Sequence, residues 1–106
     1  MIPSMPRYCS HTVILPDESR LDDFVVEVTG NSVTAYYPFT GEVHSTIYFD
    51  TPILLTPRAD LEGKTVSLNQ LTWALRDTER EATALYAYRL TPCSSCMGNR
   101  FTMSKL

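Results

Sequence analysis

Apolar and β-branched residues alternate with polar ones over the first 64 residues, and turn-forming residues interrupt this alternation at short intervals. The pattern is typical of short strands joined by turns. The first predicted strand, His11–Leu15, ends at Pro16, because proline has no backbone N–H to donate to a sheet. The short apolar run Ile53–Thr56 and the segment Asn99–Met103 near the C-terminus are two further predicted strands.

The segment Phe24–Tyr37 predicts a β-hairpin. Gly30 and Asn31 separate two β-rich runs, and a two-residue loop that begins with glycine suits a type II′ turn. This loop sets the expected register, in which three apolar pairs share one face: Val28 with Val33, Val26 with Ala35, and Phe24 with Tyr37. The opposite face is mixed, as in a half-buried antiparallel pair, and carries Val25, Glu27, Thr29, Ser32, Thr34 and Tyr36.

A third strand, Glu42–Phe49, is predicted after the turn at residues 38–41, which would complete an antiparallel meander. Its alternation places Tyr48 on the same outer face of the meander as Tyr36. Tyrosine is enriched at protein interfaces. We therefore expect Tyr36 and Tyr48 to form a binding surface for a partner protein or for a second copy of the chain.

The C-terminal half has a different pattern, with no glycine or proline between Lys64 and Thr91. Ser67 and Gln70 fit a capping box. Beyond them, apolar residues recur at helical spacing: Leu68, Leu71, Leu75, Ala82, Leu85 and Tyr86. The spacing predicts one long helix over residues 68–90, which Pro92 would stop.

Residues 68–90 also allow a second interpretation as a hairpin. Tyr86, Tyr88 and Leu90 alternate with polar or small residues, as they would in a strand, and a hairpin would bury Trp73. The turn would fall near residues 78–81, which contain neither glycine nor asparagine and are therefore poor turn formers. The helix is the preferred prediction.

Together these elements predict a β-rich α+β fold. An antiparallel meander of about four to six strands would carry one helix, from the C-terminal half, packed on one face. If residues 68–90 are a hairpin instead, the alternative is an all-β sandwich or barrel. The length of 106 residues predicts a single domain over residues 1–106.

The composition, with 43% hydrophobic and 20% charged residues, is that of a soluble globular protein. No apolar run approaches the ~20 residues that span a bilayer, so we expect no membrane association. The N-terminal residues lack the long apolar core of a signal peptide, and an odd number of cysteines (3) favours a reducing compartment. These features predict a cytoplasmic protein, although a mature exported form would look the same.

The net charge of −3 is unevenly distributed. Residues 1–63 hold three basic and nine acidic residues, a net −6, and residues 64–106 hold six basic and three acidic residues, a net +3. This balance argues against a dedicated nucleic-acid binder, which usually shows a basic excess. It leaves open an acidic partner for the second half.

One set of residues suggests chemistry: Cys9 and His11 near the N-terminus, and Cys93 and Cys96 near the C-terminus. Three thiolates and an imidazole form a known structural zinc set. A single CxxC motif is a weak signal, so redox catalysis by Cys93 and Cys96, a disulfide, or three unreactive packed thiols are alternatives.

No serine-nucleophile or phosphate-loop motif is present. The chain is therefore expected to be a small non-catalytic binding or assembly module without a cofactor. A zinc-stabilised domain and a thiol-redox protein remain the alternatives.

Overall fold

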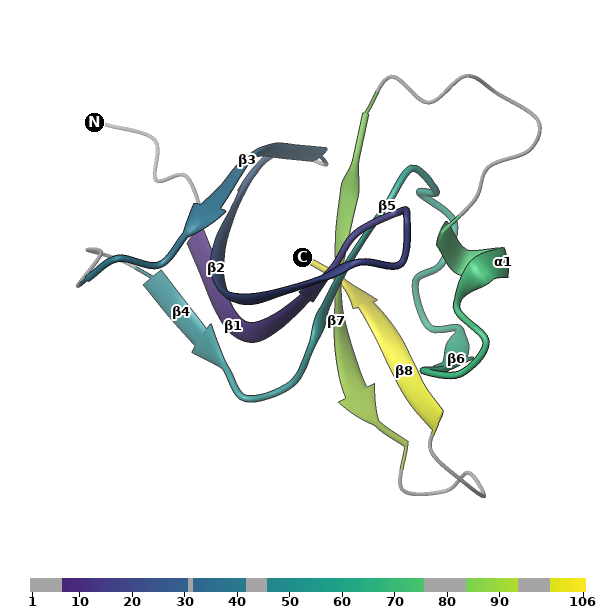
Figure 1. Ribbon diagram of the computed structural model, residues 1–106. Coiled ribbons are helices and arrows are strands. Elements are labelled where there is room, and N and C mark those ends of the chain that lie inside the picture. Colours follow the sequence, from purple (N-terminus) through teal and green to yellow (C-terminus); the bar gives the residue numbers. More distant parts are fainter. Residues whose placement is uncertain (1–6, 31, 42–45, 76–83, 94–99) are drawn as a thin grey trace.

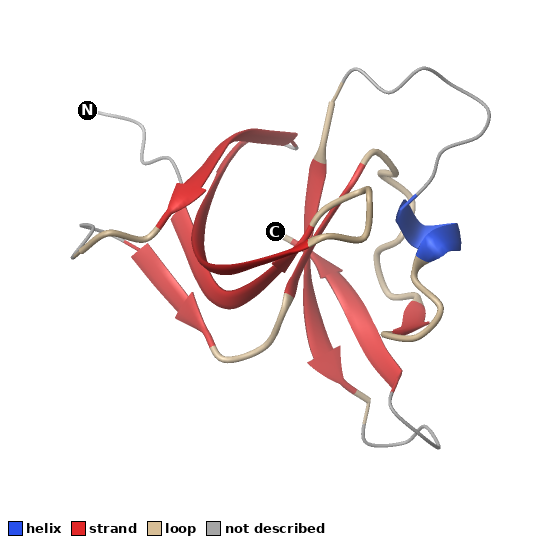
Figure 2. Ribbon diagram, viewed as in Figure 1, coloured by secondary structure: helices blue, strands red, loops and turns tan. Residues whose placement is uncertain are grey.

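The computed structural model describes residues 7–30, 32–41, 46–75, 84–93 and 100–106. Within these residues eight strands form one sheet, and one short helix lies against it (Figures 1 and 2). The elements are β1 (Arg7–Ile14), β2 (Arg20–Thr29), β3 (Ser32–Pro38), β4 (Thr46–Phe49), β5 (Ile53–Thr56), β6 (Thr65–Ser67), α1 (Thr72–Leu75), β7 (Tyr86–Pro92) and β8 (Arg100–Lys105). The predicted β-rich α+β fold is confirmed.

The sheet is mixed, whereas a purely antiparallel meander was predicted. Its strand order is β3-β2-β1-β5-β7-β8-β6, and β4 also pairs with β1. Both β4 and β5 run parallel to β1, and the other pairs are antiparallel. The observed β1 begins at Arg7, four residues before the predicted strand, and these added residues pair with β4. The chain after β3 therefore pairs with β1 instead of returning to β3, whose last residue, Pro38, has no N–H to donate.

The sheet curls so that β3 approaches the start of β7, where the Val33 N–H donates to the Leu85 carbonyl at 2.7 Å (Figure 1). We call the concave side of this curl the inner face and the opposite side the outer face. The inner face holds a buried cluster: Val13, Val26, Val28, Ile53, Leu55 and Ala87. The outer face holds a second cluster under α1, which includes Ile14, Leu54, Leu61, Leu75, Tyr88, Leu90 and Met103.

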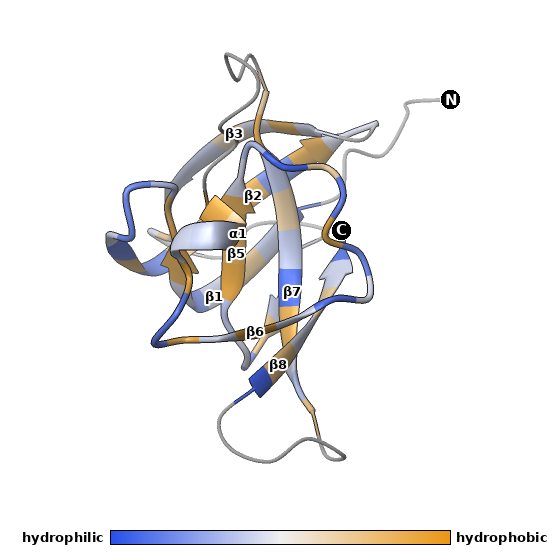
Figure 3. Cartoon of the chain, turned by 90° about the vertical axis from the view of Figure 1, so that its right-hand side faces the viewer, coloured by the Kyte–Doolittle hydropathy of each residue, from blue (hydrophilic) through white to orange (hydrophobic). Residues whose placement is uncertain are grey.

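The strands at the centre of the sheet are buried on both faces. All four residues of β5 are buried, and Figure 3 shows the strongly hydrophobic colour of this strand. A short, fully apolar strand of this kind is typical of a position between two packed layers. The helix α1 supplies part of the outer layer through Ala74 and Leu75.

The predicted hairpin forms, but its register differs from the prediction. Val28 pairs with Val33 as expected, and Gly30 takes the positive φ of 64° that favours glycine. A β-bulge between Glu27 and Val28 then inserts Thr34 as an extra residue in β3, and its hydroxyl donates to the Glu27 carbonyl at 3.3 Å. Beyond the bulge each pair is shifted by one residue: Val26 pairs with Tyr36, Val25 with Tyr37 and Phe24 with Pro38.

The long helix predicted over residues 68–90 is wrong at both ends. The helix begins at Thr72, and β7 occupies Tyr86–Pro92, while residues 76–83 lie outside the described residues. The two-residue alternation of the alternative hairpin interpretation is correct here, because Tyr86, Tyr88 and Leu90 all face the outer cluster. The Ser67 hydroxyl accepts from the N–H of Asn69 at 3.3 Å at the end of β6, so it closes a turn and caps no helix.

The remaining strand predictions are close to the observed elements. The predicted strand Ile53–Thr56 is β5, and the tail predicted over Asn99–Met103 contains most of β8. Of the predicted strand Glu42–Phe49, residues 46–49 form β4 and residues 42–45 lie outside the described residues. No helix in the part of the chain that the structure describes has the length and apolar character needed to cross a membrane.

Candidate functional site

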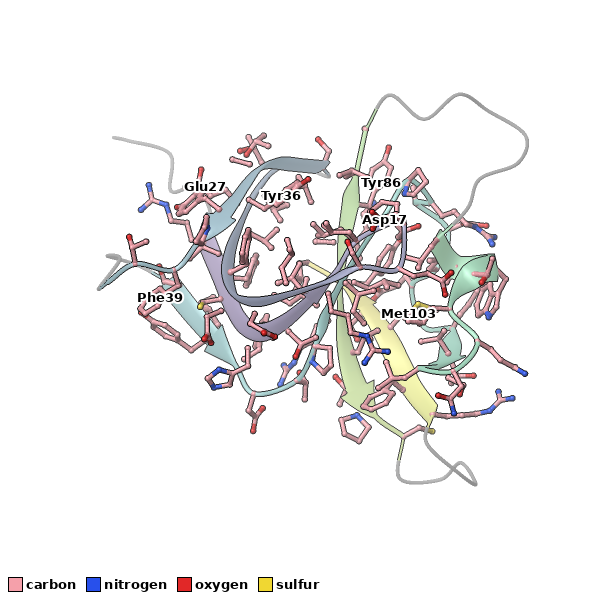
Figure 4. All side chains as sticks on the ribbon, viewed as in Figure 1. Asp17, Glu27, Tyr36, Phe39, Tyr86 and Met103 are labelled. Carbon is pink, nitrogen blue, oxygen red and sulfur yellow. The ribbon has the colours of Figure 1, made fainter. Side chains whose placement is uncertain are left out.

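The two tyrosines predicted to form one binding surface are exposed but lie on opposite faces of the sheet. Tyr36 is 41% exposed and Tyr48 is 56% exposed. Tyr36 pairs with Val26 of the inner cluster, whereas Tyr48 pairs with Cys9 and points to the outer face. Figure 4 shows Tyr36 inside the curl of β2 and β3, with Glu27 and Phe39 outside it. The prediction that the two tyrosines share one face was wrong, because the bulge in β3 turns Tyr36 to the inner face.

Strand β4 presents an open edge that the prediction missed. One edge of β4 pairs with β1, and no described strand pairs with the other, which we call the free edge. Its sequence, TIYF, contains neither proline nor charge, and its two central side chains, Ile47 and Tyr48, are 50% and 56% exposed. An apolar edge of this kind is open to pairing with another chain.

The other two edges of the sheet are better protected. Strand β3 ends at Pro38, and its start is covered through the hydrogen bond from Val33 to Leu85. Strand β6 is three residues long, and none of its residues is exposed. Among these three described edge strands, β4 carries two exposed large hydrophobic residues, β3 carries one and β6 carries none.

The edge of β4 is free because β7, which pairs with β5, does not continue alongside β4. Strands β4 and β5 follow one another along the same edge of β1, and β7 pairs with β5. The last backbone hydrogen bond in this direction runs from the Leu90 N–H to the Pro52 carbonyl, at 2.9 Å. Beyond it β7 continues beside β8, and Figure 1 shows the end of β7 diverging from β4.

Aromatic side chains cover the inner face near β4. Tyr8 stacks on Phe49 with ring centroids 5.5 Å apart, and Phe24 lies 6.5 Å from Tyr36. The guanidinium carbon of Arg89, from β7, lies 4.5 Å from the centroid of Phe49. Ile47 pairs with Tyr8 on the same face. The inner side of the free edge is therefore lined by apolar and aromatic groups with one cation at its end.

Buried polar atoms without a partner also gather around β4. Within the described residues, three such side-chain atoms are found: Oγ1 of Thr46, Oγ1 of Thr51 and Nε of Arg89. Thr46 is the first residue of β4, Thr51 follows its end, and Arg89 lies over Phe49. Buried polar groups in native proteins are nearly always satisfied, so this clustering is a second sign that the region around β4 is incomplete by itself.

The outer face beside β4 is held by a hydrogen-bonded charge network. Glu27 Oε2 accepts from the Tyr37 hydroxyl at 2.5 Å and from Nε of Arg7 at 3.0 Å. The Tyr37 hydroxyl, followed by Arg7, lowers the pKa of Glu27, and the same carboxylate raises the pKa of Tyr37. These shifts favour the ionised carboxylate of Glu27 and the protonated hydroxyl of Tyr37, which are the forms that both groups already have at neutral pH. This network therefore fits a structural role better than acid–base catalysis.

The structure does not support the predicted zinc site. Cys9 is buried and free, and burial followed by the charge of Asp23 raises the pKa of its thiol. The His11 side chain is exposed, with Nδ1 lying 2.7 Å from Asp23 Oδ1. Cys93 is disulfide-bonded, so it offers no thiolate, and Cys96 lies outside the described residues. Among the residues that the structure describes, no three His, Cys, Asp or Glu side chains lie close enough to hold a metal ion.

The surroundings of Cys93 also differ from those of a redox thiol. Cys93 directly follows β7, and its N–H donates to the Arg100 carbonyl at 3.0 Å. The low pKa of a thioredoxin-like thiol depends on a helix N-terminus next to it, whereas Cys93 follows a strand. Redox catalysis therefore stays a prediction without structural support.

Sequence reasoning missed Ile47 and Arg89. Ile47 alternates with Phe49 in the predicted strand Glu42–Phe49, which gives no sign of its exposure, and Arg89 falls within the helix predicted over residues 68–90. The available signal for Arg89 was its position between Tyr88 and Leu90, where the two-residue alternation of a strand places its side chain on the opposite face. Comparisons of the chain with protein-family models, with curated proteins and with solved structures found no match.

Proposed function

We propose that the chain is a non-catalytic protein-binding module and that its partner contributes an extended segment to the free edge of β4. The observation that carries this proposal is the exposure of β4 on both faces, beside an edge with which no described strand pairs. Edge strands that are apolar and unprotected are a liability to a protein unless they are used. Addition of a strand to a sheet edge is a recurrent mode of peptide recognition.

The free edge offers two kinds of contact to such a segment. Backbone N–H and C=O groups of β4 would supply hydrogen bonds that do not depend on the partner's sequence. Ile47 on the inner face and Tyr48 on the outer face would contact alternate side chains of the segment, because side chains alternate along a strand. Four residues of β4 span about 13 Å. Such a small contact is typical of a transient interaction.

The proposal is supported over catalysis by the state of the titratable groups near β4. Glu27 has a lowered pKa, while Cys9 and Tyr37 have raised pKa values, so each is held further in the form it already has at neutral pH. A general acid or base works best with a pKa near the operating pH. The surroundings of β4 are therefore better suited to binding than to proton transfer.

The test is selection from a library of displayed random heptapeptides, followed by hydrogen exchange on the complexes. We expect selected peptides to protect the backbone amides of residues 46–49. Tyr48→Lys or Ile47→Lys should weaken their binding about tenfold or more, because a lysine on an edge strand opposes pairing. The matched control is Trp73→Lys, since Trp73 is 42% exposed but lies on α1.

Two outcomes would overturn the proposal. In the first, the selected peptides protect another part of the chain and bind the Tyr48→Lys protein as tightly as the wild type. In the second, the protein forms a concentration-dependent dimer in analytical ultracentrifugation that Tyr48→Lys abolishes. That result would assign the free edge to a second copy of the chain instead of a partner's segment.

A further inference from the structure

We infer that the segment that pairs with β4 carries a carboxylate, which Arg89 binds at the end of the free edge. This inference rests on the proposed function and adds the chemistry of the partner to it. The contacts of Arg89 differ from those of the other partly buried arginines in the described residues, Arg7 and Arg58.

Arg7 and Arg58 both have acidic partners. Arg7 Nε lies 3.0 Å from a Glu27 carboxylate oxygen, and Arg58 contacts both carboxylate oxygens of Asp60, at 3.0 and 2.8 Å. Arg89 has no described carboxylate within ion-pair distance, and its Nε is buried without a hydrogen-bond partner. Its guanidinium carbon lies over the ring of Phe49. A partly desolvated guanidinium in this state is unfavourable unless an anion joins it.

The topology places this guanidinium beside the free edge. Because β2 takes one edge of β1, β4 and β5 must share the other, and β7 lies one strand position further on. Arg89 pairs with Ile53 of β5, so its side chain leaves β7 on the inner face. From there it reaches back to Phe49, the last residue of β4. A segment that paired with the free edge of β4 would therefore pass the guanidinium at the Phe49 end of the strand.

The chemistry of the pair indicates a carboxylate. The guanidinium carbon of Arg89 lies over the Phe49 ring, an aromatic contact that uses none of its N–H donors. A guanidinium presents these donors as a fork that matches the two oxygens of a carboxylate. Asp50, which is exposed and follows Phe49, opposes an acidic ligand at short range, and the neutral Asp50→Asn variant should therefore bind more tightly.

The experiment extends the heptapeptide selection to an Arg89→Gln protein. On the wild type, we expect the peptides that protect residues 46–49 to be enriched in Asp or Glu at one position. On Arg89→Gln this enrichment should disappear, and Arg89→Lys should retain part of it, because lysine keeps the charge but loses the fork. The matched control is Arg100→Gln, since Arg100 is exposed on β8.

A selected peptide is then synthesised in three forms: with its acidic residue, with the matching amide, and with the amide plus a free C-terminal carboxylate. The acidic form should bind the wild type about tenfold more tightly than the amide form. If the free C-terminus restores the affinity instead, the carboxylate that Arg89 binds is a chain end. Equal binding of all three forms overturns the inference, whether or not Arg89→Gln stays folded.

The outcomes separate the two proposals. Peptides that protect β4 without acidic enrichment overturn the role of Arg89 and leave the function of the free edge standing. Peptides that bind without protecting β4, or a failure to select any, overturn both. Acidic enrichment that survives in Arg89→Gln but is lost in Arg100→Gln would also overturn the inference and assign the carboxylate to β8.

Discussion

Strands β4 and β5 follow one another along the same edge of β1, yet they differ completely in burial. Every residue of β5 is buried, whereas the two central residues of β4 are half or more exposed. Both strands are four residues long and mainly apolar. The difference lies in what covers them: β7 pairs with β5, and α1 packs against the outer face of β5, whereas no described strand other than β1 pairs with β4.

The contrast shows that the burial of a short strand depends on its neighbours more than on its own sequence. Ser10 marks the point where the two environments meet, since its buried hydroxyl donates to the Thr51 carbonyl at 2.7 Å. Thr51 lies in the short connection between β4 and β5, where the pairing with β1 shifts by one residue. On one side of this point the sheet is a closed core, and on the other it ends in an open edge.

The largest effect is expected when the same residue type is truncated in each strand. Ile53→Ala should lower the free energy of unfolding by about 2–5 kcal/mol, because it leaves a cavity in the inner cluster. Ile47→Ala should change it by less than about 1 kcal/mol, because Ile47 is already half exposed. Urea unfolding followed by circular dichroism measures both. Equal losses would mean that β4 is covered in solution, which would break the comparison.

A second matched pair concerns the two threonine hydroxyls. In β5, the buried Thr56 hydroxyl donates to the Ala74 carbonyl of α1 and accepts from the Arg58 N–H at 3.2 Å. Thr56→Val should therefore cost about 1–3 kcal/mol of stability, since it leaves those backbone groups unsatisfied. In β4, Thr46 Oγ1 is buried without a partner, so Thr46→Val should be neutral or stabilising.

The same urea titrations measure the threonine pair. A loss from Thr46→Val as large as that from Thr56→Val would show that the Thr46 hydroxyl has a partner in solution. The buried polar atoms without partners around β4 would then no longer indicate that its edge is incomplete.

The elements that could be predicted from the sequence are those whose signals are local. Gly30 marks the turn between β2 and β3, and the apolar run of β5 indicates a buried strand without any knowledge of its neighbours. The bulge at Thr34 could not be predicted, because the hydrogen bonding of both strands decides where an extra residue is accommodated. One inserted residue was enough to move Tyr36 from the outer face to the inner face.

The candidate site was less predictable because it is defined by what is missing. Ile47 alternates with Phe49 in sequence as a core residue would, and its exposure follows from the divergence of β7 far along the chain. In the sequence nothing distinguishes Arg89 from other charged residues, because its contact with Phe49 is formed only in the folded structure. Long-range pairing of this kind, parallel to β1 and between β5 and β7, has no local sequence signal.

The smallest effect is expected from acid, and it should distinguish the two strands by the forces that hold them. Beside β4, Arg7 pairs with Thr46 and is bound by Glu27, whereas β5 is held by apolar burial. The Tyr37 hydrogen bond, followed by Arg7, lowers the folded-state pKa of Glu27. Its stabilisation is therefore complete above the usual glutamate pKa of about 4.3 and is lost as pH falls through the lower folded-state value.

Acidification below about pH 4 should consequently reduce the hydrogen-exchange protection of β4 before that of β5, after correction for intrinsic exchange rates. Tyr37→Phe removes the main cause of the shift, so it should lower the stability of the β4 region at neutral pH and flatten its acid dependence. Glu27→Gln should abolish that dependence. If β4 and β5 instead lost protection together at every pH, the two strands would belong to one cooperative unit, and the free edge would be as firmly held as the core it adjoins.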